Sequence, residues 1–145
     1  MADYSDPNNW TKQYVRFHRR ECLSNLREIN LLVIRYVQQG NYTAAISGLD
    51  RILNGLMTMQ NSKCGDYWSV MSMFSMVEGV LLASFGAQGI PVAIDALKDA
   101  KDFARSPDTR ENIDSMLAQL QAGMPLDGDP GDMVWLLQKM DSKLT

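Results

Sequence analysis

Histidine and cysteine are scarce in this sequence, which has one histidine and two cysteines among 145 residues. Cys22 and Cys64 lie far apart, there is no CxxC, and His18 is the only histidine, so the sequence argues against a structural zinc site. Free thiols are typical of a reducing compartment, and we expect a cytoplasmic protein. A single disulfide between the two cysteines stays open as an alternative.

Motifs that carry catalysis are also missing. The sequence has no GxxxxGK[ST], no GxGxxG, no HExxH and no Glu-x-x-His. His18 and Cys22 lie four residues apart, on one face of a helix, but no orienting carboxylate or oxyanion-hole loop accompanies them. The stretch "DGDPGD", residues 127–132, has a glycine where a calcium loop needs an oxygen ligand. We therefore predict a protein that is not an enzyme and has no cofactor.

Charge is unevenly distributed along the chain. The net charge is −3, yet residues 10–35 carry six basic and two acidic residues, whereas residues 95–145 carry six basic and ten acidic residues. This polarity favours two different partners or a head-to-tail contact between copies, so a homo-oligomer stays open. Asp95, Asp99 and Asp102 alternate with two lysines and are interpreted as a solvated helix face.

One long apolar run requires a membrane test. Residues 67–87, "YWSVMSMFSMVEGVLLASFGA", are about long enough to span a bilayer. The run contains Glu78, four serines and two glycines, and no lysine or arginine flanks it closely. The polar start "MADYSDPNNW" does not have the form of a signal peptide. We therefore expect the run to be the most buried helix of a soluble bundle, not a membrane span.

Helical periodicity dominates, and strand signals are poor. We predict an all-α fold, a bundle of five or six helices in antiparallel hairpins, as a single domain over residues 1–145 with residues 1–9 as a flexible tail. Gly40 is expected to end the first helix in a left-handed turn, with Asn41 as the next cap. The predicted helices cover residues 10–39 (with a break allowed), 42–59, 67–87, 91–105 and 107–122, followed by a short helix after Asp129.

A hairpin pattern occurs twice. "QQGNYTAAISGLDRIL" (38–53) and "AQGIPVAIDALKDAKD" (87–102) share Gln-Gly, a short turn, Ala-Ile and a leucine three residues later. The pattern resembles the tetratricopeptide (TPR) family, whose unit is a 34-residue helix–turn–helix. The resemblance implies that a protein or peptide binds in a concave groove; a plain orthogonal bundle is the alternative. The matching residues are Leu32, Tyr36, Gly40, Tyr42, Ala45 and Ile52 in the first copy and Leu81, Phe85, Gly89, Ala93 and Ala100 in the second.

Two sets of residues are candidates for partner binding. The groove set is Tyr36, Tyr42 and Leu49, and the basic set is Lys12, Arg16, Arg19, Arg20 and Arg27. We predict an adaptor, chaperone or small assembly subunit that binds a protein or peptide through the hairpin groove. The alternative is a small subunit of a nucleoprotein complex whose basic helix, residues 10–35, contacts a nucleic-acid backbone. No aromatic signature accompanies the basic set, so base recognition is not expected. A membrane surface ranks last.

Overall fold

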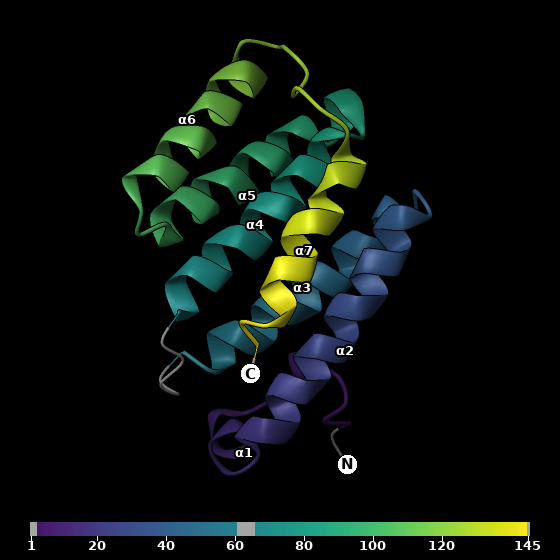
Figure 1. Ribbon diagram of the computed structural model, residues 1–145, viewed down its shortest axis with the longest axis vertical. Coiled ribbons are helices and arrows are strands. Elements are labelled where there is room, and N and C mark those ends of the chain that lie inside the picture. Colours follow the sequence, from purple (N-terminus) through teal and green to yellow (C-terminus); the bar gives the residue numbers. More distant parts are fainter. Residues whose placement is uncertain (1–2, 61–65, 145) are drawn as a thin grey trace.

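The computed structural model describes residues 3–60 and 66–144, and these residues form seven α-helices and three short 3-10 helices (Figure 1). Helix makes up 78% of the structure, the described residues contain no strand, and the helices pack antiparallel. The predicted all-α bundle is confirmed. A seventh helix arises because the first predicted helix is divided in two. Among the described helices, none has the length and hydropathy that a bilayer-spanning segment needs.

The division falls at His18, between α1 (Lys12–Phe17) and α2 (Arg19–Gln38). Thr11 caps α1, since its Oγ1 accepts a hydrogen bond of 3.0 Å from the Tyr14 N–H. The His18 backbone leaves the helical region at φ −129° and ψ 34°. Basic residues before and after His18 therefore lie on two different helices, and a single helical wheel does not relate them.

The first hairpin joins α2 to α3 (Tyr42–Thr58) through a short turn. Gly40 has φ 72°, as predicted, and the Asn41 side chain accepts a hydrogen bond of 3.2 Å from the Ala44 N–H. The helices approach closely at Gly48, where an added Cβ would lie 2.6 Å from Cγ2 of Val33.

The second hairpin joins α4 (Tyr67–Ala83) to α5 (Ile90–Phe103) through the 3-10 helix η2 (Gly86–Gln88). α4 has ten buried residues, more than any other helix, as predicted. Its small residues face α5: Ser72 Oγ donates a hydrogen bond of 2.7 Å to the Ala100 carbonyl, and a Cβ on Gly79 would lie 2.8 Å from Leu97. The helix ends four residues earlier than predicted.

The chain continues through α6 (Pro107–Gln121) and the 3-10 helix η3 (Pro130–Asp132) into α7 (Met133–Asp141). α7 returns across the molecule and lies against α2 and α4 (Figure 1). One core cluster joins α2, α3, α4 and α7, and a second joins α4, α5 and α6. Met73 and Leu136 pack against both clusters and connect them.

The N-terminal segment, for which the sequence predicts a flexible tail over residues 1–9, packs against α2 and α3 where it is described. Pro7 in the 3-10 helix η1 (Pro7–Asn9) is buried, and Trp10 is part of the first core cluster. Asn25 of α2 donates a hydrogen bond of 2.8 Å to the Ser5 carbonyl, and Asn54 of α3 donates one of 2.7 Å to the side chain of Asn8.

Candidate functional site

The residues predicted to line a groove lie at the first hairpin and are buried to different degrees. Tyr36 and Tyr42 flank the Gly40 turn, and both are half-buried against the first core cluster. Leu49 is fully buried, so its side chain packs in the core and has no free surface. A partner at this hairpin would reach only the exposed edges of the two tyrosines.

Helix α7 fills the space beside α2 and α4. Asn30, which is itself fully buried, donates a hydrogen bond of 2.9 Å from Nδ2 to the Leu137 carbonyl. Leu137, Met140 and Leu144 are buried in the first core cluster. Arg27 forms an ion pair of 3.1 Å with Asp141. The chain therefore covers this side of its hairpins with its own C-terminal helix.

The outer surface of this helix pair carries exposed apolar side chains. Trp135 is 61% exposed, and Leu31 and Leu32 of α2 are 51% and 41% exposed. Lys139 places its Nζ 4.4 Å from the centre of the Trp135 ring. The pairs Asn30–Leu137 and Arg27–Asp141 make the two helices antiparallel, so Leu31 and Trp135 lie at the same level. We call Leu31, Leu32 and Trp135 the outer α2–α7 face.

The two hairpins meet around a pocket of about 460 Å³ between α3, α4 and α5. Asp50 and Asp99 are exposed residues at its rim, and Ser75 lies below them. Glu78 follows Ser75 by one turn of α4 and is half-buried. Burial raises the pKa of Glu78 to about 9, helped by a side-chain hydrogen bond with Asp50 and by the charges of Asp50 and Asp99. Glu78 therefore keeps its proton at neutral pH.

The residues that line this pocket supply little chemistry, and Glu78 is not among them. Its lining has no histidine or cysteine, and its ionisable side chains are those of Asp50, Arg51 and Asp99. Residues 3–60 and 66–144 contain no group of three side chains placed to hold a metal ion. Glu78 was visible in the sequence as a lone acid in an apolar run, but its neighbours from α3 and α5 were not.

Asp95, Asp99 and Asp102 are exposed, as expected for a solvated helix face, and Asp99 is also affected by its neighbours. Partial burial, followed by the charges of Asp102 and Asp95, raises the pKa of Asp99. Lys101 on the same helix instead pairs with Asp114 of α6, at 2.7 Å. The acidic and basic side chains of α5 therefore have different surroundings: Asp99 lies near other carboxylates, whereas Lys101 pairs with α6.

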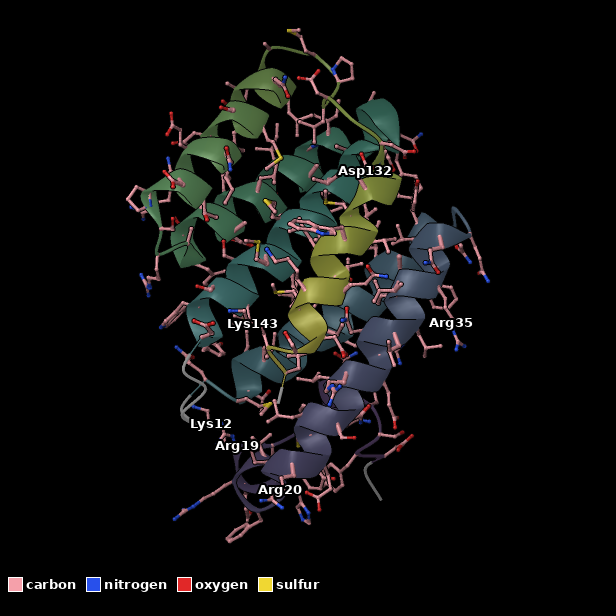
Figure 2. The ribbon with its side chains drawn as sticks, viewed as in Figure 1. Lys12, Arg19, Arg20, Arg35, Asp132 and Lys143 are labelled. Carbon is pink, nitrogen blue, oxygen red and sulfur yellow. The ribbon has the colours of Figure 1, made fainter. Side chains whose placement is uncertain are left out.

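The basic residues separate into a group of four near the ends of α1 and α2 and Arg27, which lies farther along α2. Arg27 is bound to Asp141, and this hydrogen bond raises the pKa of its guanidinium. Lys12, Arg16 and Arg20 are exposed and Arg19 is half-buried, all within three residues of an end of α1 or α2. Figure 2 shows Lys12, Arg19 and Arg20 at the same end of the molecule. We call residues 11–20 the α1–α2 corner.

Aromatic rings gather at this corner, which the sequence did not indicate. The rings of Tyr4 and Tyr14 stack with centroids 4.0 Å apart, and His18 stacks on Tyr14 at 4.4 Å. His18 is thus engaged with Tyr14, while the Cys22 thiol is buried. Burial, followed by the charge of Glu21, raises the pKa of Cys22 to about 11. The thiol is protonated at neutral pH, and Cys64 lies outside the described residues.

Comparison with known proteins adds no family. No family model matches the chain, and neither a curated protein nor a solved structure is similar to it. What stands is an all-helical, antiparallel bundle with an exposed apolar face on α2 and α7, an acidic pocket between the hairpins and a basic corner.

Proposed function

We propose that this chain is a non-enzymatic protein-interaction module, a cytoplasmic adaptor, chaperone or assembly subunit, whose partner binds on the outer α2–α7 face. The observation that carries the proposal is the exposure of Trp135. Tryptophan is the residue type most enriched at the energetic centre of protein interfaces. Here it is exposed on α7, which is hydrogen-bonded to α2, the helix that carries the exposed Leu31.

The resemblance of the two hairpins to TPR units supports the same class of function, though through a different surface. The resemblance to TPR units implies that a protein or peptide partner binds in a groove. Because α7 already packs beside α2 and α4, a partner that uses this side meets the outer surface of α7 first. The binding surface we propose is therefore the α7 surface that faces away from the core.

The chemistry of this face describes the partner. Arg35 on α2 and Lys139 on α7 are exposed cations near its two edges. A matching partner segment has apolar side chains that cover Leu31 and Trp135, with acidic groups beside them. A partner helix with one apolar stripe has this form.

Site-specific photo-cross-linking in the native host tests the proposal. A photoreactive amino acid at position 135 or 31 is expected to give one shared cross-linked product of defined mass. The same amino acid at Phe85 or Met124, which are exposed and apolar elsewhere in the fold, serves as the matched control. Absence of a product at positions 135 and 31, or the same product from all four positions, would contradict the proposal.

A substitution series then measures the contribution of each residue. With the cross-linked partner purified, Trp135→Ala is expected to weaken binding by about tenfold or more. Tyr36→Ala and Tyr42→Ala are expected to weaken it less. A larger loss with the tyrosine variants, at unchanged helix content by circular dichroism, would return the binding surface to the first hairpin.

A further inference from the structure

The α1–α2 corner carries aromatic rings at its surface, and Tyr14 among them also packs against the core. Phe17, the last residue of α1, is 70% exposed. It lies with Tyr4, Tyr14 and His18 around a hollow of about 230 Å³, which Thr11 and Gln13 complete. Pockets for drug-sized ligands occupy about 300–1,000 Å³. A hollow below that range, lined by rings, suits one flat heterocycle.

Tyr4 and Tyr14 are held in place by hydrogen bonds of their backbone and of neighbouring residues. Trp10, which is buried, donates a hydrogen bond of 2.7 Å from its indole nitrogen to the Tyr4 carbonyl. The Asn25 side chain bonds to the next carbonyl, that of Ser5. On the other side, the Thr11 cap sets the start of α1 and with it Tyr14. A preorganised site loses little conformational freedom when it binds a ligand.

Positive charge is concentrated in the same segment of the chain as the hollow. Residues 11–20 contain four basic residues and no acidic one. Lys12 and Arg16 come from α1, and Arg20 comes from the first turn of α2. Glu21 follows directly, while Asp3 and Asp6 nearby accept local hydrogen bonds from Ser5 and Asn8. The corner is therefore a cationic surface on a chain whose net charge is negative.

We infer that the α1–α2 corner binds single-stranded nucleic acid, with one base in the hollow against the ring of Phe17 or His18 and the adjoining phosphates against Lys12, Arg16 and Arg20. Base–aromatic stacking beside a cationic track is how proteins hold single strands with little sequence preference. A duplex hides the faces of its bases and meets only the charges. This inference concerns a different surface from the outer α2–α7 face and does not depend on it.

A lipid surface offers the same anionic charge, but the corner fits it less well. The hollow contains the hydroxyl of Thr11 and the amide of Gln13, which can bond to the edge of a base. A membrane-bound helix instead presents a continuous apolar face. α1 has only six residues, of which Val15 is buried and Phe17 is exposed. Lipid binding is therefore the competing outcome of the test.

Fluorescence anisotropy with short labelled oligothymidylate and oligouridylate measures the binding directly. We expect the single strands to bind more tightly than a duplex of the same length, with an affinity that falls steeply between about 50 and 200 mM salt. Phe17→Ala is expected to weaken single-strand binding by about tenfold at constant salt, since the loss of one stacked base has this order of effect. Phe85→Ala, at an exposed phenylalanine in the α4–α5 turn, is the matched control and should leave affinity unchanged.

Charge variants separate the two parts of the site. Arg16→Ala and Arg20→Ala are expected to reduce both the affinity and its salt dependence. Arg35→Ala, at the other end of α2 (Figure 2), should change neither. Failure to bind oligonucleotides at low salt would overturn the inference, and so would equal affinity of wild type and Phe17→Ala. Binding to phosphatidylserine vesicles that requires Phe17, without oligonucleotide binding, would assign the corner to lipid instead.

Discussion

The two hairpins have similar sequences at their turns, yet their corresponding glycines have different roles. In the α2–α3 hairpin, Gly40 has φ 72° and an added Cβ would meet nothing within 4 Å. In the α4–α5 hairpin, Gly89 is in the right-handed region at φ −87°, and an added Cβ would lie 1.9 Å from the Leu82 carbonyl oxygen. The left-handed conformation belongs to Gly86, three residues earlier. One glycine is required for its dihedral angles and the other for its size.

The hairpins also differ in how their helices pack. Small residues line the contact between α4 and α5: Ser72 and Gly79 on α4, and alanines on α5. The two backbones therefore come close along most of their length. α3 approaches α2 at Gly48 and again at Gly55, where an added Cβ would lie 3.0 Å from Leu26 of α2. In both hairpins an added Cβ at such a glycine meets the facing helix at 3.0 Å or less, so both should tolerate added volume poorly there.

The largest effect is expected for Gly79→Leu. The new side chain begins 2.8 Å from Leu97 and has no space to enter, so the free energy of unfolding should fall by about 3 kcal/mol. Urea denaturation measures the change. Ala87→Leu, at an exposed residue of the following turn, is the control and should stay within about 0.5 kcal/mol of wild type. An unchanged midpoint for Gly79→Leu would mean that α4 and α5 are farther apart than the structure has them.

Gly89→Ala should have the next largest effect, about 2 kcal/mol, because its Cβ would collide with backbone and not with the movable end of a side chain. The turn can shift by more than two packed helices can, which keeps the cost below that of Gly79→Leu. The same substitution at Gly40 should cost about 1 kcal/mol, which reflects the left-handed conformation alone. If Gly40→Ala costs as much as Gly89→Ala, the proposed difference between the two glycines is wrong.

Gly40→Val tests the conformational role more directly. We expect a loss of about 1–2 kcal/mol, because a β-branched residue is strained at φ 72°. Gly86→Val, at φ 74°, should show a similar loss, whereas Gly40→Asn should recover part of it, since asparagine tolerates this region. Thermal unfolding followed by circular dichroism compares the three variants. A fully stable Gly40→Val would show that the turn adopts another conformation.

Much of the fold could be predicted because its signals are local. The helix that follows Asn41, the left-handed Gly40 and the small-residue face of α4 all depend on neighbours within a few residues or on one helix face. The sequence allowed for a break in the helix predicted over residues 10–39. It did not indicate that the break lies at His18, because no glycine or proline marks that position. α4 ends early because Gly86, and not Gly89, provides the left-handed turn.

The candidate sites depend on contacts between distant parts of the chain, and the sequence could not indicate these contacts. Leu49 belongs to the apolar pattern of the first hairpin, but whether that side is open depends on where α7 packs. Tyr4 and Tyr14 join in a stack only because Trp10 binds the Tyr4 carbonyl. Arg27 differs from the other basic residues because it pairs with Asp141, more than a hundred residues later in the sequence.

The smallest expected effect concerns Glu78, one turn of α4 after Ser75 in the pocket where the two hairpins meet. Its pKa is about 9 in the fold, above its ordinary value of 4.5, so the folded protein binds one more proton than the unfolded chain between these pH values. The free energy of unfolding therefore falls as pH rises through this window. Glu78→Gln keeps the hydrogen-bonding shape without the proton, so its stability relative to wild type should rise with pH. We expect a gain of about 1 kcal/mol near pH 8 and none near pH 4. This is less than the full 1.36 kcal/mol for each pKa unit, because the pocket is open to water.

Urea denaturation of Glu78→Gln and wild type at several pH values between 4 and 9 measures this difference. Ser47→Ala changes the lining of the same pocket without an ionisable group, and its stability difference from wild type should not depend on pH. A Glu78→Gln difference that is constant across this range would place the Glu78 carboxyl in water. It would also mean that α3 and α5 do not close over α4 as tightly as the contacts of Asp50 and Asp99 indicate. A difference that grows with pH would instead show that the half-buried Glu78 carboxyl destabilises the fold near the junction of the two hairpins.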